Sequence, residues 1–408
     1  MGLVQKQIIY CDNSATTKPR AEVVGVMNKM LEEDYGNPSS LHSCGRKAKH
    51  YIEDAREQIA NVINAAKEQI IFTSGGTEAN NLVIFGVAKL FEELKDKKEK
   101  HLITTKIEHP SIKEPFEYLE KSGWNITWLD VDKEGFVDIN SLEKSITSKT
   151  VLVSVIHANN EIGTIQDVKK VASICKKNNV LFHIDAVQSF GKIPLDVVDL
   201  DIDFVSLSSH KIYGPKGSGA LFVKNPDYLK AILLGGGQEE NLRAGTENVL
   251  CIAGFGLAAK LISEEILANA TNLRKYQVDL IEKLSSLNSF IFTGPSIQKI
   301  KQNLPDEKYL FRLPGHVSIA SDLFEGESLV LQADLRGLCL GSGSACSSNK
   351  KTSLGSKIVP SHVLLACGFN EKYSNGSLRI TFGRENSARD ISSVVEVVKS
   401  IATLLALR

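Results

Sequence analysis

Residues 206–214 read SLSSHKIYG, and Lys211 lies where an apolar strand gives way to a glycine-containing turn. A second apolar stretch, LFHIDA at 181–186, carries Asp185 at its end and is followed by Gln188. Taken singly, the acid would be a helix cap or an ion-pair partner, and the lysine a surface charge. Together they favour pyridoxal phosphate, because a lysine forms a Schiff base with its aldehyde and a carboxylate keeps its pyridine nitrogen protonated.

The chain around these two strands alternates between apolar strands and amphipathic helices. Residues 46–66 carry apolar side chains at the spacing of one helix face. Several strand candidates are unbroken apolar runs, as expected for parallel strands buried on both faces. The seven strand candidates are 70–72, 102–104, 126–131, 151–156, 181–185, 204–207 and 220–223. Seven strands with interleaved helices predict an α/β fold with a doubly wound, mostly parallel sheet flanked by helices.

The pattern changes after about residue 260, which predicts a second, smaller domain of the α+β type. Residues 261–288 resemble one long connecting helix, and the remainder mixes short strands with helices. We predict a large cofactor-binding domain over 16–262. Residues 1–15 and 263–408 would form the small domain.

Composition gives no sign of a nucleic-acid or membrane partner. Lysine plus arginine and aspartate plus glutamate number 48 each, so the chain has no net charge to attract a polyanion. No apolar stretch approaches the ~18 residues of a membrane-spanning helix. The first residues lack a signal or transit pattern. We therefore expect a cytoplasmic protein, and its 408 residues are enough for two domains.

The seven cysteines include no CxxC pair, and their odd number argues against both a disulfide framework and a zinc site. We therefore predict no metal. Cys346 differs from the others because it lies in the glycine- and serine-rich run GSGSACSS at 341–348. A thiolate is strongly nucleophilic, and a mobile loop could carry it to a substrate. An incidental exposed cysteine is the alternative interpretation.

Polar residues follow five of the predicted strands, at the ends where open α/β sheets bind ligands. One such segment, TSGGTEANN at 73–81, joins a strand to a helix through two glycines. The backbone at Gly76 could approach an anion closely, and the new helix offers N–H groups together with the Thr77 hydroxyl. This suits a phosphate, although the segment is neither a Walker A loop nor a GxGxxG fingerprint. An ordinary turn before a helix is the alternative.

Five further residues each allow two interpretations. His109 could stack on a flat ring or shuttle protons, or it could be a hydrogen-bonded loop histidine. Asn160 and Gln188 could donate to a phenolate oxygen, or they could be turn residues. Either Arg379 or Arg384 could bind a carboxylate with its planar guanidinium, although a structural ion pair is the usual role of a lone arginine.

A series of short segments between about residue 8 and residue 385 is more specific than any one of them. They read YCDNSATTKP, YGNPSSLH, FTSGGTEANNL, EHPS, HANNEIGTIQ, HIDAVQSFGK, SSHKIYGPKG, RAGTEN, GSACSS and SLRITFGR. The series resembles that of the cysteine desulfurases, which are pyridoxal phosphate enzymes of the class V aminotransferase group. The resemblance implies PLP fold type I, with the seven-stranded sheet in the large domain.

The resemblance also implies a role in cofactor binding for most of the candidates. Lys211 would be the Schiff-base lysine, Asp185 the pyridinium partner and His109 the residue stacked on the ring. The ring substituents would contact Asn160 and Gln188, and the phosphate would contact Gly76, Thr77, Ser208, His210 and Thr246. Thr246 would reach in from the other subunit, which implies a homodimer with shared active sites.

For the substrate, the resemblance implies that Asn37 and Arg379 anchor the carboxylate of L-cysteine. Lys211 would remove the α-proton, and the Cys346 thiolate would attack the substrate sulfur. The products would be L-alanine and a persulfide on Cys346. The sulfur would then pass to an acceptor protein, such as a scaffold for iron–sulfur clusters, or serve tRNA thiolation.

Some features depart from the common pattern of the cysteine desulfurases. Ser14 replaces an alanine, and Glu240 replaces the usual basic residue after the glutamate of GGGQE. The GGGQE, GTEN and SHVLLACG segments also resemble selenocysteine lyases, which release selenium from L-selenocysteine. The choice between sulfur and selenium therefore stays open at this stage.

Overall fold

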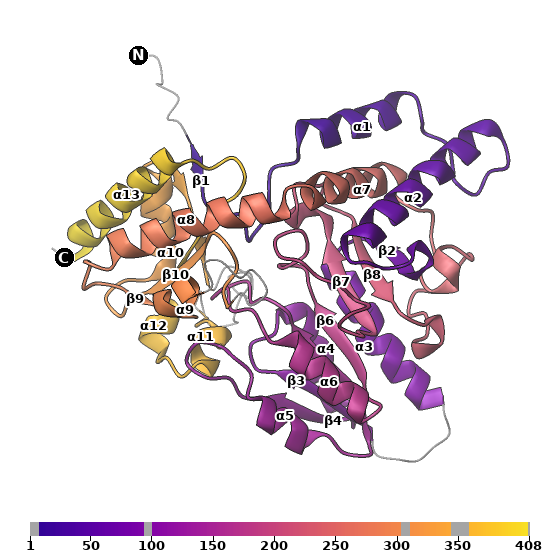
Figure 1. The fold of residues 1–408 in the computed structure, drawn as a ribbon, viewed down its shortest axis with the longest axis horizontal. Coiled ribbons are helices and arrows are strands. Elements are labelled where there is room, and N and C mark those ends of the chain that lie inside the picture. Colours follow the sequence, from indigo (N-terminus) through magenta and orange to yellow (C-terminus); the bar gives the residue numbers. More distant parts are fainter. Residues whose placement is uncertain (1–7, 94–99, 303–310, 344–358, 407–408) are drawn as a thin grey trace, which may run out of the picture.

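The computed structural model describes residues 8–93, 100–302, 311–343 and 359–406, so the predicted nucleophile Cys346 lies outside the described residues. Figure 1 shows a large sheet with its helices on the right and a smaller group of elements on the left. Both ends of the chain lie with the smaller group. Within the described parts of the chain, every helix is too short or too polar to cross a lipid bilayer.

All seven predicted strands are present, and they form one sheet in the order β2-β8-β7-β6-β5-β3-β4. β8 runs antiparallel to β2 and β7, and the other neighbours are parallel. The strands are β2 (Ile70–Thr73), β3 (His101–Thr105), β4 (Asn125–Leu129), β5 (Thr150–Ile156), β6 (Leu181–Asp185), β7 (Phe204–Ser208) and β8 (Gly219–Val223). This confirms the predicted α/β fold with a mostly parallel sheet.

Helices cover both faces of this sheet, as a doubly wound arrangement requires. One core cluster joins the sheet to α2, α6 and α7, and a second joins its other face to α3 and α4. The helices are α1 (Ala21–Glu32), α2 (Ser43–Val62), α3 (Gly76–Glu93), α4 (Pro110–Lys121), α5 (Ile139–Ser145), α6 (Val168–Lys177) and α7 (Val249–Ser263). The predicted helix 46–66 ends earlier, at Val62, because Asn64 adopts a left-handed conformation with φ of 57°.

The smaller group has its own sheet, in the order β12-β13-β10-β9, and its own apolar core. β1 (Ile9–Tyr10) joins this group by pairing in parallel with β11 (Leu338–Cys339). The other elements are α8 (Ile266–Leu284), β9 (Ile291–Phe292), α9 (Ile297–Gln302), β10 (His316–Ala320), α10 (Gly326–Asp334), β12 (Gly341–Ser342), α11 (His362–Ala366), α12 (Glu371–Asn375), β13 (Ser377–Thr381) and α13 (Ala388–Ala406). The exact division into two domains stays a prediction.

The predicted single helix over 261–288 is wrong. α7 ends at Ser263 and α8 begins at Ile266, so the helix is interrupted at Glu264 and Glu265. Glu265 lies at this break, and both of its carboxylate oxygens accept from the buried guanidinium of Arg20, at 3.0 and 2.6 Å. Because α7 packs in the core of the large sheet and α8 in the smaller core, the break connects the two cores.

Candidate active site at the edge of the large sheet

The carboxyl ends of β2 and β7 lie close together, although β8 separates the two strands. Ser208 at the end of β7 pairs with Gly219, and Gly219 pairs with Thr73 at the end of β2. The glycine turn after Thr73 therefore lies beside the turn that carries Lys211. A Cβ on Gly76 would lie 2.4 Å from Val187 Cγ2 and 3.7 Å from Ser208 Cβ, so the backbone at Gly76 packs closely against both.

Lys211 ends a short 3₁₀ turn that follows β7 directly. Its Nζ donates to the backbone oxygens of Ser14, at 2.6 Å, and Ala15, at 2.8 Å. The ammonium group is therefore held toward the N-terminal segment rather than in solvent. The two carbonyl oxygens fix the position of the Lys211 amine, whereas the amine of a typical surface lysine has no such fixed acceptors.

The same N-terminal segment supports the backbone of the Lys211 turn, a role that the sequence analysis missed. The N–H and hydroxyl of Thr17 both donate to the His210 backbone oxygen, at 2.9 and 3.0 Å. Thr17 Oγ1 also accepts from the Tyr213 N–H at 2.6 Å, and Thr16 Oγ1 lies 3.2 Å from His210 Nδ1. The motif YCDNSATTKP was the available signal, although nothing in the sequence showed what it contacts.

Asp185 is buried at the end of β6, and two donors orient its carboxylate. Oδ1 accepts from the Val187 N–H at 3.0 Å, and Oδ2 accepts from Asn80 Nδ2 at 2.9 Å. The same amide group donates to Ser111 Oγ at 2.8 Å, and Ser111 Oγ lies 2.8 Å from His109 Nδ1. Asn80 therefore connects the acid to the histidine, and it was not among the predicted site residues.

His109 caps the N-terminus of α4, where its Nδ1 accepts from the Ser111 N–H at 3.2 Å. The ring proton of the neutral form therefore belongs on Nε2. Burial lowers the pKa of His109, the charge of Asp185 raises it, and the charge of Lys211 lowers it again. Asp185 and Lys211 are therefore each within electrostatic range of His109.

A second buried acid, Glu108, lies beside His109. Its Oε1 accepts from Thr105 Oγ1 at 2.6 Å and from the Ile156 N–H at 2.9 Å, while Oε2 has no hydrogen-bond partner. Burial raises the pKa of Glu108 to about 8, and the charge of Asp185 adds to this effect. Glu108 is therefore largely protonated at neutral pH.

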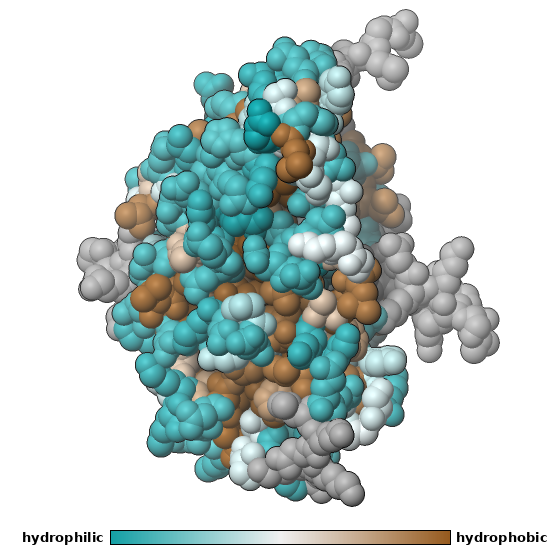
Figure 2. Space-filling view, turned by 90° about the vertical axis from the view of Figure 1, so that its right-hand side faces the viewer, coloured by the Kyte–Doolittle hydropathy of each residue, from teal (hydrophilic) through white to brown (hydrophobic). Residues whose placement is uncertain are grey.

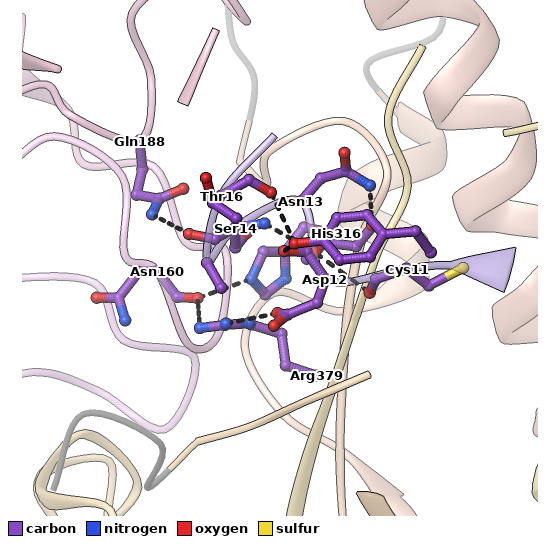
Figure 3. A network of polar contacts seen from close by, with 12 residues as sticks. Cys11, Asp12, Asn13, Ser14, Thr16, Asn160, Gln188, His316 and Arg379 are labelled. Atoms are coloured by element: carbon purple, nitrogen blue, oxygen red, sulfur yellow. Dashed lines mark hydrogen bonds and ion pairs between the residues drawn. The ribbon is translucent and has the colours of Figure 1, made fainter. Parts of the chain in front are cut away.

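Arg379, predicted to bind a carboxylate, is buried between two fixed acceptors (Figure 3). Nη2 donates to Asp12 Oδ1 at 2.9 Å, and Nη1 donates to the backbone oxygen of Asn160 at 3.0 Å. The same oxygen lies 3.2 Å from His316 Nε2, which must be the donor because a carbonyl only accepts. Arg379 Nε has no partner, so this guanidinium retains hydrogen-bonding capacity.

Two predicted site residues, Asn37 and Thr246, are exposed and are not joined to Arg379 or Lys211 by any contact in the described residues. Asn37 lies between α1 and α2, where its Oδ1 accepts from the Ser39 N–H at 2.9 Å. Residues next to each of them line one hollow of about 440 Å³: Pro38 and Ser39 on one side, and Glu247 on the other. Both segments therefore border the same region of the surface.

The residues on either side of the undescribed stretch 344–358 converge on one buried acid, Glu161. Its Oε2 accepts from Ser361 Oγ at 2.5 Å, and a Cβ on Gly343 would lie 2.9 Å from the same oxygen. Burial raises the pKa of Glu161 to about 7, with Ser361 and Arg379 acting in the opposite direction. Gly343 and Ser361 therefore lie close to the same carboxylate oxygen.

The residues present fit pyridoxal phosphate. The helix that begins at Gly76 offers N–H groups to a phosphate, and Ser208 lies against that turn. Burial lowers the pKa of His210 to about 4, with nearby lysines adding to the effect, so His210 is neutral at pH 7. The buried carboxylate of Asp185 suits a protonated ring nitrogen, and Lys211 supplies the amine.

Comparison of the sequence with known proteins finds a matching family model and similar proteins along nearly the whole chain. The family model for class V aminotransferases matches residues 9–394. The cysteine desulfurase IscS of Dictyoglomus turgidum is 42% identical over 399 residues, which cover 97% of this chain and 95% of that protein.

Solved structures agree with the sequence comparison. A NifS-like protein superposes with a TM-score of 0.85 at 32% identity, covering 98% of this chain and 100% of that one. A structure described as SspA in complex with cysteine superposes with a TM-score of 0.76 at 32% identity, covering 91% of this chain and 98% of that one.

Proposed function

This chain belongs to the class V aminotransferase family, and from that premise we propose that it is a pyridoxal phosphate-dependent cysteine desulfurase acting on L-cysteine. Relatives that carry this name match nearly the whole chain, and one similar structure contains cysteine. The observation that supports the proposal best is the convergence of Lys211, Asp185 and His109 at one edge of the sheet, next to the turn at Gly76.

In the proposed site, the chain holds the cofactor at both ends. Gly76, Thr77, Ser208 and His210 would hold the phosphate, and Asp185 would hold the ring nitrogen in its protonated form. His109 would stack on the ring, while Asn160 and Gln188 would contact its substituents. When bound, pyridoxal phosphate supplies an electron sink for the electron pair left at the substrate Cα.

Lys211 would bind the cofactor and later act as the base at the substrate Cα. The backbone oxygens of Ser14 and Ala15 accept hydrogen bonds from Nζ, so they would hold the amine in place once substrate has replaced it. A proton taken from Cα would stay on Nζ between these two carbonyls until it is returned to the product. The position of Lys211 on a short turn directly after β7, with its Nζ held by two carbonyl oxygens, favours such a short transfer.

Arg379 would bind the carboxylate of L-cysteine. Asp12 and the Asn160 backbone oxygen occupy one donor each, which prevents rotation of the guanidinium. Asn37 would contribute to the same anchor. A fixed, planar donor group selects a substrate with a carboxylate at one end.

Cys346 would accept the sulfur. Its thiolate attacks the sulfur of the substrate, a new S–S bond forms, and the bond between sulfur and Cβ breaks. The electron pair of that bond stays on the carbon product, which becomes L-alanine after protonation. The persulfide sulfur then passes to an acceptor protein, such as an iron–sulfur scaffold or a tRNA-thiolation partner, and we place this reaction in the cytoplasm.

We propose that the working form is a homodimer in which Thr246 of one subunit reaches the phosphate bound by the other. Large apolar side chains are exposed between α1 and α2, where Tyr35 is 80% and Leu41 90% exposed, and after β8, where Leu234 is 76% exposed. Figure 2 shows the face at the right of Figure 1, where apolar atoms lie among polar ones, mostly in the middle and lower part. A partner subunit would cover such surface.

The proposal is tested by incubating the purified protein with pyridoxal phosphate, L-cysteine and a thiol reductant. We expect L-alanine and sulfide in equal amounts, and an absorbance of the lysine-bound cofactor that borohydride abolishes. Lys211→Ala should lose both turnover and that absorbance. Cys346→Ala should keep the absorbance and stop sulfide release. Alanine formation without sulfide in the parent protein would contradict the proposal.

The sequence analysis left selenium open as the leaving element. The same assay should therefore be run with L-selenocysteine at equal concentration. A desulfurase turns over both substrates and needs Cys346 for sulfur, whereas turnover of selenocysteine alone would replace the proposal with a selenocysteine lyase.

A further inference from the structure

The side-chain amide of Gln188 is buried between two polar groups that leave it one orientation. Its Nε2 donates to the Ser14 backbone oxygen at 2.9 Å, and its Oε1 accepts from Lys192 Nζ at 3.2 Å. A backbone carbonyl only accepts, so the NH₂ group must face Ser14 (Figure 3). The remaining oxygen needs a donor, and Lys192 supplies one.

The local fold brings these two side chains together. Residues 186–193 form a helical turn in which the Phe190 N–H donates to Ala186 O at 2.8 Å. Gln188 and Lys192 both lie on this turn, and Lys192 Nζ reaches Gln188 Oε1 across it, at 3.2 Å. Gly191, at φ +69°, packs against the residue after Lys211, because a Cβ there would lie 2.9 Å from Ile212 Cγ2. The turn and the Lys211 segment are thus packed as one unit.

Lys192 lies in surroundings that disfavour a charged amine. It is partly buried, and it lies within electrostatic range of two other cations, Lys211 and Arg379. Burial lowers the pKa of Lys192 to about 7, and these two charges add to the effect. An amine in such a place costs stability, which is offset only by an interaction that it makes there. The hydrogen bond to Gln188 is that interaction.

The chain of contacts leads from Lys192 to Lys211. The Ser14 backbone oxygen accepts from both Gln188 Nε2 and Lys211 Nζ. We propose that Lys192 is a positioning residue that fixes the amide of Gln188 with its NH₂ group facing the Lys211 end of the site. The inference rests on the proposed function, since Gln188 is there a contact of the cofactor. Without Lys192 the amide keeps the Ser14 oxygen as an acceptor but loses the donor to Oε1, so it is held at one end instead of two.

The test uses the holoenzyme and four variants: Lys192→Met, Lys192→Arg, Gln188→Leu and the double variant Lys192→Met/Gln188→Leu. The first readout is the pH midpoint of the absorbance of the lysine-bound cofactor without substrate. A donor close to a protonating group opposes protonation, so its loss should raise this midpoint by about one unit in Lys192→Met. The second readout is kcat, which should fall about tenfold with a smaller change in KM.

Positioning and charge make different predictions for the remaining variants. If Lys192 acts through Gln188, Lys192→Arg restores both readouts to within about twofold of the parent, and Lys192→Met adds nothing in the Gln188→Leu background. If Lys192 acts only through its charge, the effect of Lys192→Met is the same in both backgrounds, and the proposal is overturned. An unchanged Lys192→Met enzyme also overturns it.

Two controls separate other causes. Thermal unfolding of each apoprotein shows whether a variant is folded, and Lys192→Ala replaces Lys192→Met in both backgrounds if Lys192→Met is not. Lys169→Met removes an exposed lysine that pairs with Asp199 and should leave both readouts unchanged. A parent protein without the cofactor absorbance would refute the proposed function itself, and with it this inference. An active parent with an unaffected Lys192→Met variant refutes the inference alone.

Discussion

Arg379 and Asp12 are 367 positions apart in the sequence, yet Nη2 of the arginine lies 2.9 Å from Oδ1 of the aspartate. The side chains are 6% and 20% exposed, so this pair is shielded from solvent far better than a surface ion pair. It joins the N-terminal segment to the central strand of the smaller sheet. The pair therefore fixes the guanidinium that we propose binds the substrate carboxylate.

Replacing Asp12 by Asn should raise the KM for L-cysteine about tenfold and change kcat less, because a neutral amide orients the guanidinium less firmly. Steady-state kinetics measures both constants. The matched control is Glu385→Gln, which breaks the exposed pair of Lys18 and Glu385 and should have no effect on KM. Equal KM values for parent and Asp12→Asn would show that the pair does not orient Arg379 for binding.

Replacing Asn80 by Leu should weaken the binding of pyridoxal phosphate about tenfold, because Asp185 loses one of the two donors that orient its carboxylate. Titration of the apoprotein with cofactor, followed by absorbance, measures the dissociation constant. Asn140→Leu, at an exposed position at the start of α5, serves as the control. A dissociation constant equal to that of the parent would remove Asn80 from the site.

Glu108 should make stability depend on pH. Its pKa is raised from 4.5 to about 8 in the folded state, so the folded protein binds more protons than the unfolded chain between these values. Its stabilising contribution is fully present below pH 4.5 and is lost as the pH rises toward 8. Glu108→Gln should remove this loss. Between pH 4.5 and about 8, the free energy of unfolding of the variant should therefore rise relative to that of the parent by on the order of 1 kcal/mol per pH unit.

Urea unfolding of the parent and Glu108→Gln at several pH values between 5 and 9 measures this difference. The glutamine can still accept from Thr105 and Ile156, so the comparison isolates the ionisation. A constant difference between the two proteins across this range would mean that folding does not raise the pKa of Glu108.

Glu239→Gln should lower the free energy of unfolding by about 2 kcal/mol, because it leaves the largely buried guanidinium of Arg56 with only the more exposed Glu53 as a counter-charge, 3.5 Å away. Glu239 contacts Arg56 at 2.8 Å and also accepts from the Phe72 N–H at 2.7 Å, so it connects its own turn to β2. That turn has three consecutive left-handed residues, Glu239, Glu240 and Asn241. Such strain persists only when neighbouring contacts hold it.

Urea denaturation measures the loss. Asp199→Asn breaks the exposed pair with Lys169 and should cost less than about 1 kcal/mol. Equal decreases in the free energy of unfolding for the two variants would show that the buried Arg56–Glu239 pair stabilises the protein no more than an exposed pair does.

The strands of the large sheet could be predicted because their signal is local. β5 and β7 are buried almost throughout, and a run such as TVLVSVI is apolar enough to show this without any partner. Gly76, Asp185 and Lys211 could be singled out for a similar reason, since each lies at the end of such a strand or within three residues after it. Their roles in catalysis stay predictions.

What could not be predicted depends on contacts between distant parts of the chain. The break at Glu265 needs Arg20, which lies 245 positions away, and the position of Lys211 needs Ser14, 197 positions away. Asn80 and Lys192 carry no distinctive local pattern, because their meaning comes from the side chain that each one contacts. The segment around Cys346 lies outside the described residues, so its prediction is neither supported nor corrected.

The N-terminal segment has a consequence for synthesis. Residues 12–17 leave the ribosome long before β13, yet Asp12 and Asn13 find their partners in β13, whose Thr381 oxygen accepts from Asn13 Nδ2 at 2.8 Å. The large sheet can be complete after residue 223, whereas Asp12 can hold the guanidinium of Arg379 only after β13 has emerged. A chain halted between these two points would carry the amine of Lys211 without its carboxylate anchor, so the order of translation itself delays the chemistry until β13 has been made.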